Sequence, residues 1–177
     1  MDKIDYKIIS DITVANDSRF AHFTDIKKAV EYAKKFKRMF PSIGTPSILI
    51  KEGQYLLSEK IVIDTDMTIL GSGPTTVISR APTFYNVGGG SVTFGSAEIN
   101  NVPFVIGSES NISSADIVNG VLFKDLVIRS SAPGVADPAD QGVANCFFLI
   151  AQDLATNSDA VFRFENINFI GNSNLQS

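Results

Sequence analysis

Apolar and polar residues follow a helical period over residues 24–40. The apolar positions are spaced three and four residues apart, so they share one face of a helix. These positions are Ile26, Ala29, Val30, Ala33 and Phe40, and the basic positions around them are Lys27, Lys28, Lys34, Lys35, Lys37 and Arg38. Thr24 is a suitable N-cap, Asp25 suits the positive end of the helix dipole, and Pro41 ends the helix. The pattern predicts one amphipathic helix whose apolar stripe covers another surface.

Short apolar runs separated by turn residues follow from residue 47 onward. The runs are residues 48–50, 55–57, 61–63, 67–70 and 77–78, and the turns between them carry Gly, Asp and Ser. Strands this short and apolar suit a parallel stack, in which each strand pairs with the strands above and below it and alternate side chains fill the interior. We therefore predict a mainly β protein whose parallel strands are wound in coils.

A weak internal repeat supports the stacked arrangement. Residues 123–128 match residues 164–169 in the order aromatic, charged, Asp or Asn, apolar, any residue, apolar. With coils of roughly 20 residues, this spacing predicts a separation of two coils, with residues 146–150 in the intermediate coil. Asp125 and Asn166 then occupy turns, where a short polar side chain tolerates left-handed backbone angles.

The remaining segments organise the chain as one domain with an N-terminal arm, a helix and a stacked region. The predicted boundaries are residues 1–20 for the arm, 21–41 for the capping helix and 42–177 for the coils, with polar excursions at about 81–117 and 130–141. Short strands are also expected at residues 6–9, 12–14, 92–94 and 104–106. Excursions from a wall of strands are where binding surfaces are usually built.

Charge is unevenly divided along the chain. Residues 1–60 hold 11 of the 15 Lys and Arg residues against 8 acidic residues, whereas residues 61–177 hold 4 against 11. Most of the early basic residues belong to the predicted helix, so we interpret them as its solvated face and not as a polyanion site. Nucleic acid is therefore not expected as a partner.

The composition, with 44% hydrophobic and 19% charged residues, is that of an ordinary folded protein. No stretch approaches the roughly 20 continuous apolar residues that span a bilayer, so no membrane span is expected. Residues 1–10 lack the apolar core and the cleavage site of a secretory signal peptide. We expect a soluble protein without a Sec signal peptide. If it leaves a cell, we expect it to do so by another route, such as lysis within a virus particle.

Few residues offer metal or nucleophilic chemistry. Cys146 is the only cysteine and His22 the only histidine, which excludes an intrachain disulfide and a cysteine-rich zinc site. We interpret Cys146 as core filling within an apolar run and His22 as locally structural. No metal or cofactor is expected.

Two acid pairs and one aromatic pair are the remaining candidates for polysaccharide chemistry. They are Asp137 with Asp140, Asp153 with Asp159, and Phe84 with Tyr85. Loop aspartates are common in turns, so neither acid pair is assigned as catalytic. An aromatic pair in a strand can form a platform for a sugar ring, but it more often packs in a core.

Residues 12–79 contain four short sequence motifs that resemble those of a known superfamily. They are ITV at 12–14, FTDIKKAV at 23–30, ILIKEGQY at 48–55 and TILGSG at 68–73. These words resemble the start of the pectin methylesterase and pectate lyase superfamily, which includes β-helix domains of bacteriophage tailspike and tail-fibre proteins. The resemblance implies a right-handed parallel β-helix, a solenoid, in which residues 24–40 cap the N-terminal end.

The matching motifs mark a helical cap, a turn and the first coils, and they include no catalytic residue. In the esterase branch of the superfamily, the catalytic carboxylates, glutamine and arginine lie several coils beyond a strand that resembles residues 162–169. The segment Gln152-Asp153-Leu154 lacks the threonine of the esterase word Gln-Asp-Thr-Leu, and no acid cluster of the calcium-binding lyase kind is evident. No catalytic or carbohydrate-binding residue is therefore assigned, and the sequence leans away from an enzyme.

Functions of different classes remain open. The first is a structural or receptor-recognition component of a bacteriophage virion, such as a tail spike, tail fibre or head fibre, with bacterial surface polysaccharide as a candidate ligand. The alternative is the N-terminal portion of a polysaccharide lyase, esterase or glycoside hydrolase. A standalone carbohydrate-binding module is a third, weaker interpretation.

The last apolar strand predicts that the chain does not act alone. Residues 162–170 are as apolar as the earlier strands, and the mostly polar residues 171–177 follow them. An uncovered end would expose strand edges and the apolar interior of the stack, which native β proteins avoid. We expect cover from more polypeptide, from sister chains or from another virion protein, and the tailspike resemblance favours a homotrimer.

Overall fold

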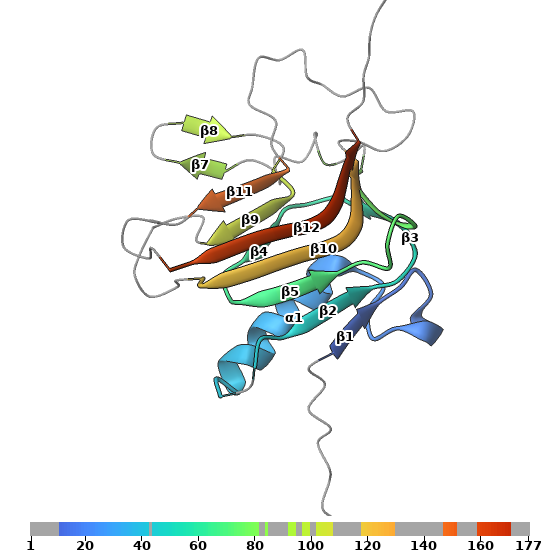
Figure 1. Cartoon of the computed structure of the whole chain (residues 1–177), viewed down its shortest axis with the longest axis horizontal. Helices are drawn as coiled ribbons and strands as arrows, with labels where there is room; N and C mark the ends of the chain where they lie inside the picture. Colours follow the sequence, from blue (N-terminus) through green and yellow to red (C-terminus); the bar gives the residue numbers. More distant parts are fainter. Residues whose placement is uncertain are drawn as a thin grey trace, which may run out of the picture.

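The computed structural model describes residues 11–42, 44–81, 84, 92–94, 97–99, 102–107, 118–129, 147–151 and 159–170. Within these residues the chain forms one α-helix, a short 3₁₀ helix at Ser18–Phe20 and a series of strands (Figure 1). The helix is α1 (Ile26–Met39), and the strands are β1 (Asp11–Val14), β2 (Ser47–Ile50), β3 (Gly53–Leu57), β4 (Ile61–Ile63), β5 (Met67–Leu70), β6 (Thr76–Arg80), β7 (Val92–Phe94), β8 (Ala97–Ile99), β9 (Phe104–Gly107), β10 (Gly120–Arg129), β11 (Phe148–Ala151) and β12 (Val161–Ile170). The strand predicted at 6–9 lies outside the described residues.

Most of the strands pair in parallel and form a curled sheet (Figure 1). The sheet runs in the order β1-β2-β5-β10-β6-β3, and β12 also pairs with β10. A second parallel sheet has the order β11-β9-β4, and β7 and β8 form an antiparallel pair. The prediction of a mainly β protein with parallel strands and one helix is confirmed. Its finer form, a right-handed parallel β-helix, stays a prediction.

Strand β10 curls the sheet because it bends in its middle. Its first half, up to Lys124, pairs with β5, and its second half, from Val127, pairs with β6. Asp125 lies between the halves with φ 56°, in the left-handed region. Strand β12 repeats the bend at Asn166, with φ 51°, and Asn166 Nδ2 donates to Asp125 Oδ1 at 2.6 Å. The left-handed backbone angles expected for both residues are confirmed, although both lie within strands β10 and β12 and not in turns between strands.

The bend in β10 also explains the glycine that follows β5. The Gly71 N–H donates to the Lys124 carbonyl at 2.8 Å, and the Gly73 N–H donates to the Asp125 carbonyl at 2.8 Å. A Cβ on residue 71 would lie 2.2 Å from the Asp125 carbonyl oxygen, which no side chain tolerates. The glycine is therefore required by the close approach of the bent strand.

Replacing Asp125 by valine should lower the free energy of unfolding by about 1–3 kcal/mol, because a β-branched residue resists the left-handed conformation. Asp125→Gly is the matched control, since it also removes the hydrogen bond to Asn166 but accepts a positive φ. We expect Asp125→Gly to be the more stable of the two variants in urea denaturation. Equal losses would mean that the backbone angle is not what this residue supplies.

The two matching segments of the internal repeat, 123–128 and 164–169, are 41 residues apart and lie on neighbouring strands. They are not separated by two coils. Phe123 pairs directly with Phe164 in the parallel register of β10 and β12. The predicted intermediate coil at 146–150 is therefore wrong, because β11 pairs with β9 in the second sheet. Ile48 and Ile69 also pair, and they are much closer in sequence because no long excursion separates them. The excursion between Phe123 and Phe164 lengthens the chain between these paired residues. Their spacing therefore does not look like that of the paired residues Ile48 and Ile69.

The strand predicted at 104–106 exists, but it belongs to the wall of parallel strands. Strand β9 lies between β4 and β11 in the second sheet, with Phe104 paired to both Ile61 and Phe148. The departure from the strand pattern is therefore shorter than residues 81–117. Strand β7 matches the strand predicted at 92–94, whereas its partner β8 has no counterpart in the prediction.

Helix α1 is shorter than residues 24–40, and its ends differ from the prediction. Asp25 and not Thr24 is the N-cap, because its Oδ1 accepts a hydrogen bond at 2.9 Å from the backbone N–H three residues on. Phe40 is the C-cap with a non-helical backbone, and its side chain is 46% exposed instead of lying on the apolar face. Phe36, one helical turn earlier, is buried in its place.

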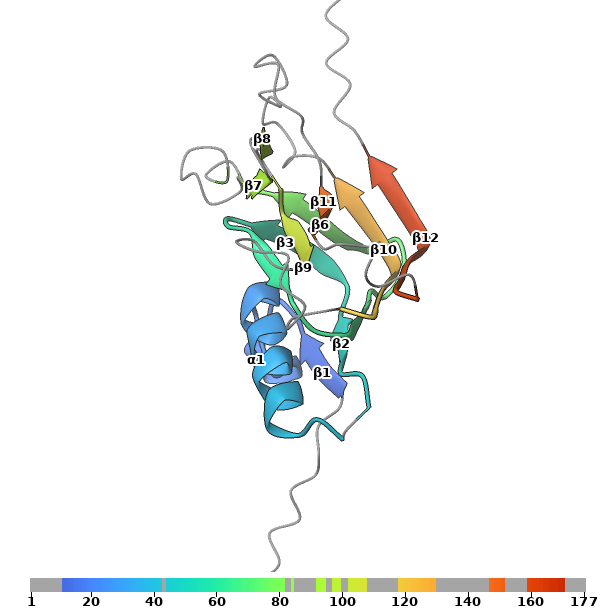
Figure 2. The same ribbon diagram turned by 90° about the vertical axis from the view of Figure 1, so that its left-hand side faces the viewer.

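Helix α1 lies across one end of the stack (Figure 2). The predicted positions Ile26, Ala29, Val30 and Ala33 are all buried. The helix contacts β1 and β2 at one edge of the curled sheet and β4 at the edge of the second sheet. Its position across both edges protects the interior of the stack from water at this end.

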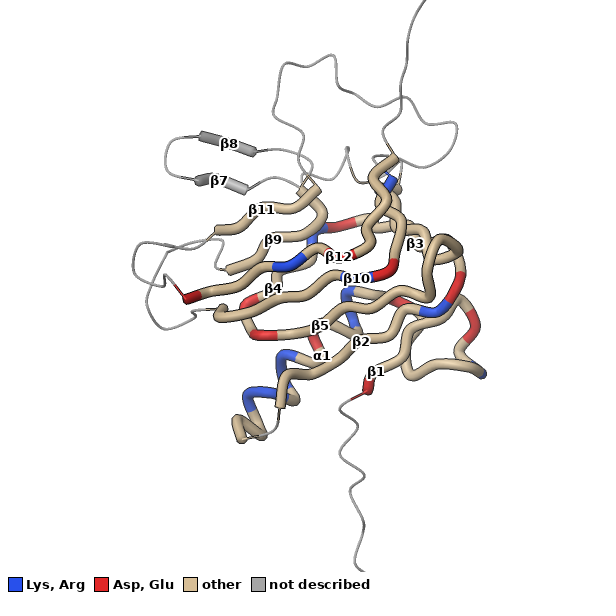
Figure 3. The backbone as a smooth tube through the Cα atoms, viewed as in Figure 1, with Lys and Arg blue, Asp and Glu red and all other residues tan. Residues whose placement is uncertain are grey.

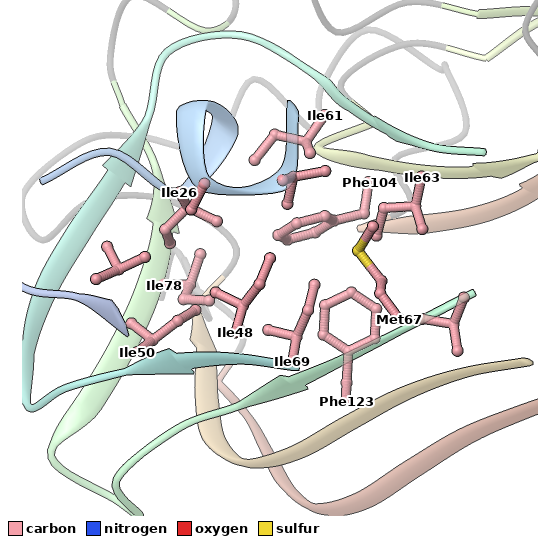
Figure 4. Packing of buried hydrophobic residues seen from close by; sticks show 14 of the residues in the cluster. Ile26, Ile48, Ile50, Ile61, Ile63, Met67, Ile69, Ile78, Phe104 and Phe123 are labelled. Atoms are coloured by element: carbon pink, nitrogen blue, oxygen red, sulfur yellow. The ribbon is translucent and has the colours of Figure 1, made fainter. Parts of the chain in front are cut away.

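The interior is built from ladders of paired side chains (Figure 4). Ile12 pairs with Ile48, Ile48 with Ile69, and Ile69 with Phe123, and all four side chains are buried. Each strand therefore adds one layer to a continuous apolar column, as alternation of side chains across parallel strands requires.

Lys34 is buried, although the sequence assigns it to the solvated basic face. Its Nζ lies 3.0 Å from Glu31 Oε1 and 3.3 Å from Asp64 Oδ2, and it donates to the Val62 carbonyl at 3.2 Å. These partners offset the cost of burying the ammonium group. Lys and Arg also mark other positions along α1 in Figure 3. The helix thus uses one of its basic residues to dock on the turn between β4 and β5.

Candidate interaction surface

The end of the stack opposite α1 is formed by β12 (Figures 1 and 2). Among the described residues, β12 pairs with β10 alone, so its other edge has no strand beside it. The interior positions of β10 are Val121, Phe123, Leu126 and Ile128, which are all buried, and their partners on β12 are Phe162, Phe164, Ile167 and Phe169. Phe164 is 39% exposed and Phe169 is 58% exposed. The alternate apolar side chains of β10 therefore have apolar neighbours on β12, and no described strand covers those of β12.

Phenylalanine rings from both sheets meet beneath this end. Phe148 of β11 has its ring centroid 4.8 Å from that of Phe123, 4.8 Å from that of Phe164 and 6.4 Å from that of Phe169. Phe104 of β9 stacks on Phe148 at 5.3 Å. Ring contacts of this kind add to the free energy of burial and fix the relative position of the strands. The cluster ties the two sheets together where the described stack ends.

The outer face of β12 carries a compact group of charges. Arg163 Nη2 lies 2.5 Å from Glu165 Oε1, and Lys124 Nζ on β10 lies 3.6 Å from Glu165 Oε2. The side chains of Arg163 and Glu165 are 63% and 32% exposed. An exposed ion pair contributes little to stability, so these charges can pair with a partner at small cost. We call Phe164, Phe169, Arg163 and Glu165 together the β12 surface.

The structure describes three of the residues that the sequence singled out for chemistry. His22 is exposed, and its Nδ1 accepts a hydrogen bond from the Thr13 N–H at 3.1 Å, which gives it a local structural contact. Phe84 is 1% exposed and belongs to the core, so it is not a platform for a sugar. Asp159 is exposed in the turn that precedes β12. Tyr85, Asp137, Asp140, Cys146 and the segment Gln152-Asp153-Leu154 lie outside the described residues.

Most carboxylates of the described residues are engaged in contacts that hold the fold. Besides Asp125 and Glu165, they are Asp17 with Arg19, Asp25 at the start of α1, Glu31 and Asp64 with Lys34, Glu59 with Lys27, and Asp66 with the backbone N–H groups of Asn119 and Gly120. Hydrogen bonds from Arg19 hold the pKa of Asp17 below its usual value. Charge-assisted contacts of this kind stabilise turns and helix ends, and the side chains of Asp17, Glu31 and Glu59 remain 40%, 43% and 59% exposed.

A small polar hollow lies beside the N-terminal end of α1. Its volume is about 100 Å³, and its lining includes Asn16, Asp25, Lys27, Ser58 and Glu59. Lys27 and Glu59 pair with each other. Small-molecule sites usually measure about 300–1,000 Å³, and a water molecule takes about 30 Å³, so the hollow suits a few water molecules and not a sugar ring.

Comparison of the chain with protein-family models, with curated proteins and with solved structures finds no match. Within the part of the chain that the structure describes, no group of three or more His, Cys, Asp or Glu side chains could hold a metal ion. No helix of the described residues is long and apolar enough to cross a membrane.

Three of the large apolar side chains that these residues expose, Val161, Phe164 and Phe169, lie on β12.

The sequence indicated an apolar last strand but missed the ring cluster beneath it. The spacing of the internal repeat predicts that Phe148 lies in a coil between β10 and β12, whereas its strand belongs to the second sheet. The adjacent pair Phe147-Phe148, together with Phe104 in another short apolar run, is the signal that predicts a stack of rings along that sheet. The charged pair on the outer face of β12 gave no sequence signal of its own.

Proposed function

We propose that this chain forms the coils of a right-handed parallel β-helix and serves as a structural or receptor-recognition component of a bacteriophage virion. Equivalent positions pair from strand to strand, and the left-handed residues Asp125 and Asn166 stand in successive strands of the same ladder. A helix covers one end of the stack. These features support the resemblance to the pectin methylesterase and pectate lyase superfamily and to its bacteriophage tail members.

The observation that carries a non-catalytic role is the engagement of the carboxylates in the fold. A glycoside hydrolase needs two carboxyl groups that face each other across a sugar. Among the described residues, Asp64 binds Lys34 and Arg38, and Asp66 binds backbone N–H groups. Carboxylates used in this way favour a rigid scaffold over a cleft that binds and cleaves a substrate.

We predict that the purified chain does not cleave polysaccharides. Incubation with pectin, polygalacturonate and bacterial surface polysaccharides, followed by assays for reducing ends and unsaturated products, should give the same signal as buffer. Turnover that is abolished by Asp137→Asn or Asp153→Asn would overturn this prediction. That result would favour the alternative, the N-terminal portion of a polysaccharide lyase, esterase or glycoside hydrolase.

The virion role is tested on particles and not on the isolated chain. An antibody raised against the purified chain should detect it in bacteriophage particles that have been purified through a density gradient, and immunogold should place it on a tail or head appendage. Retention of an intact bacterial polysaccharide by the purified chain would add receptor recognition to a purely structural role. Absence of the chain from particles that its own genome encodes would contradict the proposal.

A further inference from the structure

We propose that the β12 surface binds the β12 surface of a second copy of this chain, antiparallel and about a two-fold axis centred on Phe164. The inference goes beyond the proposed function, because it depends only on the edge of β12 and holds in or out of a virion. It concerns the edge of β12 with which no described strand pairs.

The backbone of β12 presents the hydrogen-bonding groups of Phe164 to this copy. The Val161 N–H donates to the Asn119 carbonyl at 2.7 Å, on the side of β10. The N–H and C=O groups of alternate residues in a strand point to opposite edges, so those of Phe162 and Phe164 point away from β10. A residue with both groups on the open edge exchanges two hydrogen bonds with the residue opposite in an antiparallel pair. Phe164 therefore pairs with Phe164 of the second copy.

The charges of β12 select this register over its neighbours. With the axis at Phe164, Arg163 faces Glu165 of the second copy, and the same contact is repeated on the other side of the axis. An axis at residue 163 would place Arg163 opposite Arg163, and an axis at residue 165 would place Glu165 opposite Glu165. Like charges directly opposite destabilise a ladder, whereas opposite charges stabilise it. The β12 edge is therefore complementary to itself in one arrangement.

The same register covers the interior at Phe164, before the bend at Asn166, whereas Phe169 lies beyond the bend and has no β12 residue of the second copy opposite it. The rings of Phe123 and Phe164 are stacked with centroids 5.7 Å apart, so each strand extends one column of side chains. Phe164 of the second copy adds the next layer to this column and shields a ring that is 39% exposed in the single chain. Burial of this apolar area drives the association, and the charges outside it fix the register.

A two-fold contact of this kind closes on itself. Each copy uses the same surface, so no β12 surface remains for a third chain, and an open filament cannot grow from it. A trimer, which the tailspike resemblance implies, would need a different surface.

Light scattering after gel filtration at micromolar concentration provides the test, with charge-reversed variants. The wild-type chain should elute at twice the mass of one chain. Arg163→Glu and Glu165→Arg should each weaken the dimer about tenfold or more, because each places two like-charge pairs in the ladder. An equimolar mixture of the two variants should restore the dimer, since every pair across the axis is then of opposite charge. Lys35→Glu, on the exposed face of α1, is the control and should leave the dimer unchanged.

The mixture separates the proposal from a folding defect. Circular dichroism of each variant should match that of the wild type, and a misfolded variant would not regain a dimer on mixing. A wild-type monomer, a trimer or an open series of larger species would overturn the proposal. So would two variants that dimerise as well as the wild type, or a mixture that remains monomeric.

Discussion

Val30→Asp is expected to destabilise the protein by roughly 3–5 kcal/mol, because it places a carboxylate in an apolar site without a partner. Val30 is fully buried on the face of α1 that packs against β1, β2 and β4. For a chain of this length, a loss of this size lowers the melting temperature by about 10 °C. Thermal unfolding followed by circular dichroism measures it.

Lys35→Asp is the control for this change, because it introduces the same residue on the exposed face of the same helix. Its cost should stay within about 0.5 kcal/mol, as for most surface substitutions. A Val30→Asp variant that melts within a degree or two of the wild type would mean that α1 does not cover the end of the stack.

Phe104→Ala is expected to cost about 3–5 kcal/mol, the range for removing a buried phenylalanine ring. The Phe104 ring is fully buried and lies 5.2 Å from the ring of Phe123 and 5.3 Å from that of Phe148. Its removal leaves a cavity where the curled sheet meets the second sheet. Because a domain is stable by only about 5–15 kcal/mol, this single change removes a large share of the total. Urea denaturation measures the loss.

Phe20→Ala is the matched control, since Phe20 is 62% exposed in the short 3₁₀ helix. We expect a loss below about 0.5 kcal/mol for this variant. Similar losses for Phe104→Ala and Phe20→Ala would show that the ring cluster does not join the two sheets.

The local elements of this fold could be predicted from the sequence because their signals are local. The helix could be predicted from the spacing of its apolar residues Ile26, Ala29, Val30 and Ala33. Strand β5 could be predicted from a short apolar run between turns. The left-handed backbone angles of Asp125 and Asn166 could be predicted because short polar side chains tolerate a positive φ. Each of these inferences used residues within a few positions of one another.

The pairing of strands could not be predicted in the same way, because long segments separate the partners. Phe123 and Phe164 are neighbours in the sheet, yet the excursion between them made their spacing look like two coils. Lys34 is buried because Asp64, on a distant turn, lies close to it in the folded chain. The β12 surface has the same origin, since Phe148 meets Phe164 only when both sheets have formed.

The parallel pairing of β12 with β10 is tested most directly by nuclear Overhauser contacts between backbone protons of the isotopically labelled chain. We expect contacts that link Val121 with Phe162, Phe123 with Phe164 and Ile128 with Phe169, all at one constant offset and in the same direction along both strands. Contacts whose offset changes steadily along the strands would indicate an antiparallel pair. That result, or contacts from β12 to β11 in place of β10, would contradict the stacked fold on which the proposed function and the dimer depend.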